Sequence, residues 1–561
     1  TAILMPIYNE DSERVFAGLR AIHQSLAETG QLDGFDFFIL SDTRDPDVWV
    51  EEELRWQDMA RALDGKGRVF YRNRPENTSR KSGNLEDFCT RWGGHYRYMI
   101  VLDADSIMKG ETLVEMVRLM ERHPGVALIQ TPPVPVNRES LFARILQFAS
   151  SIYGRMFTAG LNYWQLGESN YWGHNAIIRI QPFLDCCGLP KLPGREPFGG
   201  DILSHDFVEA ALLRRAGWEV WLAYDLEGSY EEIPPTLIDY AKRDRRWCQG
   251  NLQHLRLALS HGFNVLSRLH FSMGVMSYVA SPLRLLFLIA TGVRAYFETQ
   301  QEPVYFFGEN WAPVWPVSFA VEMTTVLLVT LTMLFLPKLL ALLLLFKDRR
   351  LARAYGGMGG ATLSVVLETV FSVLTAPVLM LFQTKFVLAI LMRRAVGWPP
   401  QQRGDHMTGF REAASAHGVQ TLIGVAAGVL SYQYVPAFFW WFTPVLLGLG
   451  LSIPVSMLSS SIALGRKARE LGLFLTPEET DPPAVMRYLE DNLREGEPVL
   501  REPPGKRRRH YLEGLVHQLE EEGPDGLNPA QKRDLISDPE TLLRLHALFW
   551  SRPPANAGML P

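Results

Sequence analysis

A long apolar region in the middle of the chain constrains the fold more than any other feature. Residues 271–461 are mainly apolar, whereas the residues before them are mixed and charged, and those after them are polar. A helix needs about 20 apolar residues to cross a membrane, and the 561-residue chain is too long for one ordinary domain. We therefore expect a cytosolic domain at 1–270, a transmembrane domain at 271–464 and a polar cytosolic tail at 465–561.

Four segments of the central region have the length and composition of membrane spans. They are residues 273–297, 317–346, 419–435 and 437–458. Lys and Arg gather at 347–353, 393–394 and 466–469, whereas 300–315 has none, which places the basic connectors in the cytoplasm.

The apolar stretch 361–392 lies between two connectors on the same side of the membrane. It must therefore cross zero or two times, as an interfacial or re-entrant element or as a tight hairpin. Its polar interruptions favour the interfacial alternative.

The first 270 residues alternate short apolar runs with amphipathic stretches. The runs at 2–5, 35–40, 98–102 and 126–129 indicate strands, and 12–26 and 110–122 indicate helices. This alternation predicts an α/β domain with an open, mostly parallel sheet. Residues 138–160 have one apolar helical face, which fits either a core-facing surface helix or a helix in the membrane interface.

Charge and cysteine content exclude some classes of function. A net charge of −5 does not indicate the basic surface that nucleic-acid-binding proteins need. The four cysteines lack zinc spacing and favour a reducing, cytosolic compartment. Because the chain opens directly on an apolar strand, we expect the natural protein to continue upstream of Thr1.

Acidic side chains follow three of the predicted strands. Asn9-Glu10, Asp42 and Asp103 each lie at a strand end, where ligands of open α/β sheets bind. Asp103 and Asp105 form an Asp-x-Asp motif that can reach one divalent cation, Mg²⁺ or Mn²⁺. Lys81, beside a Gly-containing turn, suits a diphosphate, although it could equally be an exposed surface charge.

Two later segments also carry candidate chemistry. Asp206 opens a helix, where it could stabilise the helix N-terminus or act as a base, and Asp201 and His205 are nearby acid–base candidates. Residues 242–251 contain four cations and Trp247, which could also attract anionic lipid.

The ordered set of motifs resembles the processive inverting glycosyltransferases, which include cellulose, chitin and hyaluronan synthases. The resemblance covers residues 1–460 and rests on Pro6-Ile-Tyr8-Asn9-Glu10, Asp42, Asp-x-Asp, Asp206 and the pair Arg246-Trp247. Residues 171–175, Tyr-Trp-Gly-His-Asn, resemble the acceptor motif of that family.

The residues of two motifs are more similar to those of the bacterial branch that makes osmoregulated periplasmic glucans. Ser204-His205-Asp206 stands where most relatives have a Glu before the Asp. Arg243 stands where the usual Gln would hold the acceptor, so that role is not carried over simply from cellulose synthase.

The resemblance implies a role for each motif. Asp206 would be the catalytic base, and Asp103 and Asp105 would hold the metal, with Asp105 the more direct ligand. The donor nucleotide would contact Pro6, Tyr8, Glu10, Asp42, Lys81, Asp103 and Arg246. The acceptor would contact Trp247, Arg243, Gly173, His174 and Asn175. A gating loop at 398–409 would include Arg403, His406 and Thr408.

The resemblance also implies an activity: transfer of glucose from UDP-glucose to a growing β-glucan, with a β-1,2 backbone, in the bacterial inner membrane. The catalytic domain would face the cytoplasm, the glucan would cross the membrane, and a periplasmic glucan-processing protein could be a partner. The alternatives are a synthase of another β-polysaccharide such as cellulose, a lipid-linked sugar transferase, and a non-catalytic membrane scaffold.

Overall fold

A seven-stranded sheet of order β3-β2-β1-β4-β8-β6-β9 forms the centre of the N-terminal domain. The computed structural model describes residues 1–63, 68–300, 320–394, 404–494, 504–523 and 526–550. The strands are β1 (Ala2–Ile7), β2 (Asp36–Ser41), β3 (Val69–Asn73), β4 (Tyr98–Val101), β6 (Val126–Gln130), β8 (Ala176–Arg179) and β9 (Glu219–Leu222). Only β8 runs antiparallel to its neighbours, so the predicted mostly parallel sheet is confirmed.

Helices cover both faces of this sheet because alternate strand residues point to opposite sides. On β1, Ile3 and Met5 pack with one set of helices, whereas Ala2 and Leu4 pack with the other. The first set contains α1 (Ser12–Glu28), α2 (Pro46–Ala62) and α4 (Gly110–Arg122). The second contains α3 (Arg80–Arg91), α6 (Ile180–Cys186) and α7 (His205–Arg215). Short 3-10 helices follow at η1 (Leu32–Gly34) and η2 (Gly93–His95).

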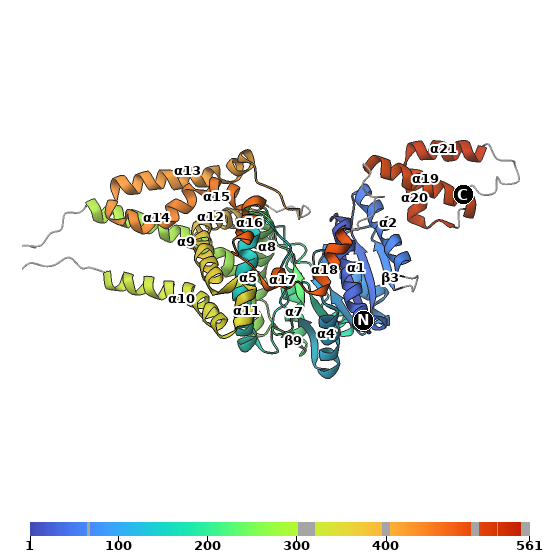
Figure 1. Ribbon diagram of the computed structural model, residues 1–561, viewed down its shortest axis with the longest axis horizontal. Helices are drawn as coiled ribbons and strands as arrows, with labels where there is room; N and C mark the ends of the chain where they lie inside the picture. Colours follow the sequence, from blue (N-terminus) through green and yellow to red (C-terminus); the bar gives the residue numbers. More distant parts are fainter. Residues whose placement is uncertain (64–67, 301–319, 395–403, 495–503, 524–525, 551–561) are drawn as a thin grey trace, which may run out of the picture.

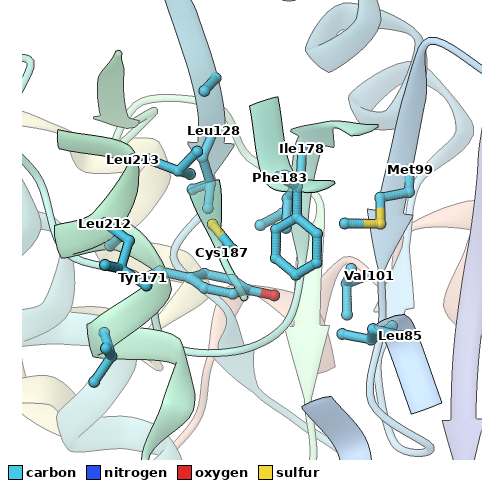
Figure 2. Close-up of a cluster of buried hydrophobic side chains, with 14 of the residues drawn as sticks. Leu85, Met99, Val101, Leu128, Tyr171, Ile178, Phe183, Cys187, Leu212 and Leu213 are labelled. Carbon is cyan, nitrogen blue, oxygen red and sulfur yellow. The ribbon is translucent and has the colours of Figure 1, made fainter. Parts of the chain in front are cut away.

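The second cluster anchors the loop that precedes β8. Figure 2 shows the Tyr171 ring below Phe183, with Leu212 of α7 on one side and Val101 of β4 on the other. Tyr171 is fully buried, and its hydroxyl has no hydrogen-bond partner among the described residues. Packing of this ring therefore fixes where residues 172–175 leave the core.

A small second sheet, of order β5-β10-β7, lies beside the large one. Its strands are β5 (Ile107–Met108), β7 (Val134–Pro135) and β10 (Ser229–Glu231). Two long helices, α5 (Leu141–Gln165) and α8 (Leu237–Ala258), connect this domain to the apolar region.

Four helices are long and apolar enough to cross a membrane, and a bent pair could make a fifth span. The four are α9 (Val265–Gln300), α10 (Ala320–Lys347), α12 (Gly357–Leu391) and α13 (Phe410–Tyr434). The bent pair is α14 (Pro436–Gly450) and α15 (Ser452–Ser459), which meet at 55°. Figure 1 shows α9, α10, α13 and α14 extending together away from the sheet. The predicted outer connector, 300–315, lies almost entirely outside the described residues.

Residues 361–391 lie in one unbroken helix, α12, which ends one residue before the predicted stretch does, so the tight-hairpin alternative is wrong. Both halves of α12 contact helices of the N-terminal domain. Near its start Val365 packs in the cluster of Phe148 on α5, and near its end Ile390 packs in the cluster of Leu252 on α8. These contacts favour the interfacial arrangement, which stays a prediction.

Helix α5 shows features of both alternatives considered for it. Its inner face carries Ile145 and Phe148 into a buried cluster, whereas Phe157, Tyr163 and Leu166 at its far end are exposed. An exposed aromatic group of this kind is typical of a helix end at a membrane interface.

The polar tail returns to the N-terminal domain. After α16 (Ile462–Glu470), α17 (Pro477–Thr480) lies against α5, where Arg144 donates to Glu479 at 2.5 and 2.9 Å. Helix α18 (Ala484–Arg494) then packs on α1. The remaining helices are α11 (Arg349–Ala354), α19 (Pro504–Glu522), α20 (Pro529–Ser537) and α21 (Pro539–Trp550).

Candidate active site

The carboxyl ends of β2, β1 and β4 lie side by side because these strands are adjacent and parallel. The sheet therefore brings Asn9-Glu10, Asp42 and Asp103 to one edge, as the sequence predicted. Asn9 adopts a φ of 54° and joins two of the strand ends. Its N–H donates to Thr43 Oγ1 at 2.9 Å, and its side-chain oxygen accepts from the Arg44 N–H at 3.0 Å.

Three predicted donor-pocket residues lie close to Asn9 in the sequence. Tyr8 and Glu10 flank it in the segment after β1. Pro6 lies in β1, opposite Leu40 of β2. The Tyr8 N–H donates to the Glu10 carboxylate, which fixes that side chain at the strand end.

Asp42 is buried and pairs with Arg74, which the sequence analysis missed. Arg74 Nε and Nη2 donate to the two Asp42 oxygens, each at 2.7 Å. Arg74 Nη2 also donates to the Arg80 carbonyl at 3.0 Å. A bidentate arginine–carboxylate pair is strongly directional, so Arg74 ties the end of β2 to the segment that carries Lys81.

Lys81 joins the Asp-x-Asp motif to the loop before β8. Its ammonium group donates to Asp103 and to the Gly173 carbonyl, the latter at 2.8 Å. Asp103 is further held by its own N–H, which donates to Ser106 Oγ at 2.9 Å. The Lys81 ammonium group thus brings the Asp-x-Asp motif together with Gly173, which is 92 residues from Lys81 in sequence.

Asp206 lies against Gly173. A Cβ atom on Gly173 would be 3.1 Å from Asp206 Oδ2, and the φ of +95° at this position favours glycine. Burial raises the pKa of the Asp206 carboxyl above its ordinary value, against the opposing charge of His205. A carboxylate with a raised pKa is a stronger base once it is ionised.

The two other acid–base candidates of this segment have different surroundings. His205 Nδ1 lies 2.9 Å from Glu209 Oε1. Burial lowers the pKa of His205, but the charge and hydrogen bond of Glu209 outweigh it, so the pKa is raised. Asp201 is 3.8 Å from Lys191 at the surface, away from this group.

Residues of the acceptor motif contact β10. Asn175 is fully buried and donates to Ser229 Oγ at 2.8 Å and to the Tyr230 carbonyl at 3.3 Å. His174 Nε2 lies 3.5 Å from Glu231 Oε2. Glu231 is a further residue of the site that the sequence analysis missed.

Helix α8 presents the predicted acceptor platform. The Arg243 guanidinium lies 4.5 Å from the Trp247 ring centroid and 5.5 Å from that of Tyr240. Trp247 is 45% exposed, so one face of the indole remains available for a ligand. Arg246 is partly exposed on the same helix.

The second half of α8 holds the segment that leads to Asp206. A Cβ atom on Gly250 would lie 2.2 Å from Ser204 Oγ, so only glycine admits this approach. The Leu203 N–H donates to Gln253 Oε1 at 3.0 Å, and His254 Nε2 lies 3.0 Å from the Ser204 carbonyl.

The described part of the predicted gating loop reaches α8. His406 Nε2 is 3.3 Å from Asp239 Oδ2 in the first turn of α8. The Thr408 N–H donates to Ser460 Oγ at 2.9 Å. Arg403 and the rest of 398–403 lie outside the described residues.

A cavity of about 700 Å³ opens beside the nucleotide end of this site. The cavity is lined by Asn9, Glu10 and Ala104 from the sheet domain and by Asp405 from the predicted gating loop. Residues of α17 and α18 in the tail line it as well. The tail therefore contributes to the surroundings of the predicted donor pocket.

No cluster of three or more His, Cys, Asp or Glu side chains within the described ranges has metal-binding geometry. Asp103 and Asp105 are the carboxylates predicted to hold a divalent cation, and one or two carboxylates together with substrate phosphates are the usual ligands of Mg²⁺.

Known proteins match both parts of the chain. The family described as glycosyl transferase family 2 matches residues 2–186, and glycosyl transferase family group 2 matches 98–347. The chain is 48% identical over 575 residues to glucans biosynthesis glucosyltransferase H of Pseudomonas paraeruginosa, covering 98% of this chain and 67% of that protein. The protein of the same name from Cupriavidus pinatubonensis is 47% identical over 582 residues, covering 100% of this chain and 67% of its own length.

Among solved structures, the chain is similar to the mannosyltransferase PcManGT from Pyrobaculum calidifontis in complex with GDP-Man and Mn²⁺. The TM-score is 0.40 at 12% identity, covering 70% of this chain and 87% of that one.

The sequence relatives thus share almost the whole of this chain, and it corresponds to about two thirds of their length. The matched region therefore includes both the sheet domain and the apolar helices. The chain belongs to the glucans biosynthesis glucosyltransferase H family, within glycosyl transferase family 2.

Proposed function

We propose that this protein is an inverting glucosyltransferase that uses UDP-glucose to elongate a β-glucan and passes the product across the bacterial inner membrane. One observation carries the proposal: Lys81 joins Asp103 to the Gly173 loop, against which Asp206 lies. A motif suited to a diphosphate thus lies beside the buried carboxyl group of Asp206, which would act as the base. The names of the relatives support glucose and a glucan, whereas the β-1,2 backbone is proposed from the resemblance of the motifs alone.

The donor nucleotide would bind at the edge formed by β2, β1 and β4. Pro6, Tyr8, Glu10 and Asp42 would line the uridine pocket, and Lys81 would face the diphosphate. Asp42 is already oriented by Arg74, so its pocket is formed before the nucleotide enters.

Asp103 and Asp105 would hold Mg²⁺ or Mn²⁺. When bound, the cation would act as a Lewis acid that stabilises negative charge on the leaving diphosphate. Arg246 would add a positive charge that persists at every physiological pH.

Asp206 would remove the proton from the attacking acceptor hydroxyl. General-base catalysis of this kind contributes roughly 10²- to 10⁴-fold to a rate. The hydroxyl attacks the anomeric carbon on the face opposite the diphosphate, so an α-linked donor gives a β-linked product. No covalent enzyme intermediate is needed.

The acceptor glucan would stack on the exposed face of Trp247, beside Arg243, Gly173, His174 and Asn175. The helix with this platform is followed directly by α9, the first apolar span. A product leaving the platform would therefore already be at the membrane. His406 and Thr408, together with Arg403, would belong to a loop that closes over the donor.

Charge distribution supports the orientation. Lys347 and Arg349–Arg350 follow the end of α10, and Arg393–Arg394 follow α12. A cytoplasmic location for these cations places the catalytic domain in the cytoplasm. A periplasmic glucan-processing protein is the partner that such a product would require.

The test is transfer of labelled glucose from UDP-glucose by purified protein in lipid, with linkage analysis of the product. Asp206→Asn should abolish transfer and leave UDP affinity unchanged. Asp105→Ala should remove the Mg²⁺-dependent part of UDP binding. Near-normal turnover by Asp206→Asn would exclude Asp206 as the base.

The same assay separates the alternatives. A β-1,4 product would indicate a cellulose-type synthase, a lipid-linked product would indicate a lipid glycosyltransferase, and no UDP release would indicate a scaffold.

A further inference from the structure

The last two residues of strand β10, Tyr230 and Glu231, and the residue after it, Glu232, have side chains of alternating direction. Tyr230 packs with α1 and α18, and Glu232 is buried and paired with Arg14 of α1 and with Arg138 at 2.8 Å. Neighbouring side chains of a strand point to opposite faces. With Tyr230 and Glu232 held on one face, Glu231 must point to the other.

That other face is the candidate active site. Glu231 lies 3.5 Å from His174, and the charges of Asp105, Arg243 and Asp103 all act on it. Burial raises the pKa of the Glu231 carboxyl. Glu231 therefore lies beside His174 of the acceptor motif, within electrostatic range of both the Asp-x-Asp motif and Arg243 of α8.

His174 provides a second polar atom at the same position. Its side chain is 14% exposed, and Nε2 faces Glu231. Its other ring nitrogen, Nδ1, is buried without a hydrogen-bond partner in the described part of the chain. When Nε2 carries the proton and faces Glu231, Nδ1 can accept a hydrogen bond. No donor for this bond lies among the described residues.

We propose that Glu231, together with His174, recognises hydroxyl groups of the glucose unit that is being transferred. The proposal rests on the function proposed above. The diphosphate is bound at Asp103 and Asp105 and the acceptor at Arg243 and Trp247, so the group between them is the donor hexose. A carboxylate oxygen and an unprotonated imidazole nitrogen both accept hydrogen bonds from hydroxyl groups. Neither atom can donate a hydrogen bond to a phosphate.

This assignment makes Glu231 a determinant of sugar specificity. A site that hydrogen-bonds a substrate hydroxyl discriminates strongly against an analogue that lacks it, because the buried polar group is then left unpaired. UDP alone, which has no hexose, should not depend on Glu231.

The experiment combines Glu231→Gln with a series of UDP-deoxyglucose donors that each lack one hydroxyl. Wild-type protein should lose about 10- to 100-fold in kcat/KM with at least one of these donors, as for one hydrogen bond to a charged group. Glu231→Gln should lose a similar factor in kcat/KM with UDP-glucose. Removal of that same hydroxyl from the donor should lower the kcat/KM of the variant little further. UDP affinity should stay within about twofold of the wild-type value.

Glu227→Gln is the matched control, because Glu227 is 71% exposed and pairs with Arg155 at the surface. It should behave as wild type with every donor. Glu231→Asp keeps the charge but withdraws it by one methylene, and it should keep UDP affinity while losing kcat/KM.

Three results would overturn the assignment. In the first, Glu231→Gln retains the wild-type kcat/KM with UDP-glucose. In the second, each deoxy donor lowers the kcat/KM of the variant by as large a factor as it lowers that of the wild type. In the third, the variant loses Mg²⁺-dependent UDP binding. The last result would place Glu231 in the cation site. If wild-type protein releases no UDP from UDP-glucose at all, the proposed function fails instead, before any variant is compared.

Discussion

Gly250→Ala tests how α8 positions Asp206. A Cβ atom at this position would lie 2.2 Å from Ser204 Oγ, 2.9 Å from Ser204 N and 3.0 Å from Ser204 Cβ. The hydroxyl can rotate away, but the backbone nitrogen and Cβ cannot. The added methyl group must therefore displace the segment that leads to Asp206, two residues further along.

Two opposing energies set the change in stability. Alanine is favoured over glycine inside a helix by about 0.5–1 kcal/mol, whereas overpacking a tight contact costs about 1–3 kcal/mol. The net destabilisation is therefore about 0–2 kcal/mol, small enough for the protein to fold. A shift of about 1 Å in a reacting group can cost roughly 10²-fold in rate, so turnover should fall far more than stability.

The assay measures UDP release from UDP-glucose, UDP affinity and the thermal unfolding temperature in detergent. UDP affinity should be unchanged, because a Cβ atom on Gly250 would clash with Ser204 and not with the strand ends that would bind the nucleotide. Gly154→Ala on α5 is the control: its Cβ would meet nothing within 4 Å, so turnover should be normal. Adding Ser204→Gly to Gly250→Ala removes both clashing side-chain atoms and should restore part of the rate.

Wild-type turnover by Gly250→Ala, with no shift in unfolding temperature, would refute this reasoning. It would mean that the loop before Asp206 adapts without moving the carboxylate.

Further predictions concern buried charges. Arg74→Met leaves Asp42 buried and unpaired, which should cost about 3–5 kcal/mol in unfolding free energy and weaken UDP binding; calorimetry measures both. Burial lowers the pKa of His254 to about 4, so the unfolded chain binds a proton that the folded one refuses. Stability should then fall by about 1.4 kcal/mol per pH unit as the pH drops from 6.5 toward 4, and His254→Gln should show a shallower decline in pH-dependent unfolding. Arg144→Met should release Glu479, which limited proteolysis of the C-terminal tail would detect.

The sequence predicted the sheet where strands are apolar and alternate with helices. It missed β3, an edge strand whose outer residues are partly exposed and polar, such as Arg72. It missed β9, the other edge strand, where exposed Glu219 interrupts the apolar pattern. It also missed β8, because an irregular loop, not a helix, precedes that strand. These failures arise where burial, which produces the apolar pattern, is incomplete or where the alternation of elements is broken.

The site was predictable where a residue follows a strand or opens a helix, as Asp103 and Asp206 do. Arg74 was missed because nothing local shows that its partner is Asp42, 32 residues away. Glu231 had a usable signal: it is the last of three residues in a short strand, and the residues on either side of it, Tyr230 and Glu232, are both buried. The orientation of Glu231 follows only once the partners of Glu232 are known.

Helix α8 explains how one element can serve the acceptor, the base and the membrane together. Arg243, Trp247, Gly250 and His254 recur at intervals of three or four residues, so they share one face of the helix. Trp247 would form the acceptor platform, and Gly250, three residues later, holds the segment before Asp206. The rise of α8 between these two residues is about 4.5 Å, so one short stretch of helix would link the acceptor platform to the segment that carries the proposed base.

The adjacent face of α8 is fixed by the apolar helices. Asp244 accepts from Tyr278 of α9 at 2.8 Å and from Gln383 of α12 at 2.9 Å, and Leu252 packs in the same cluster as Val275 and Val378. A helix bound on two faces cannot rotate without breaking one set of contacts. Any movement of α9 or α12 that turned α8 would move Trp247 and Asp206 together, so their relative geometry would survive while their position relative to the bound nucleotide changed.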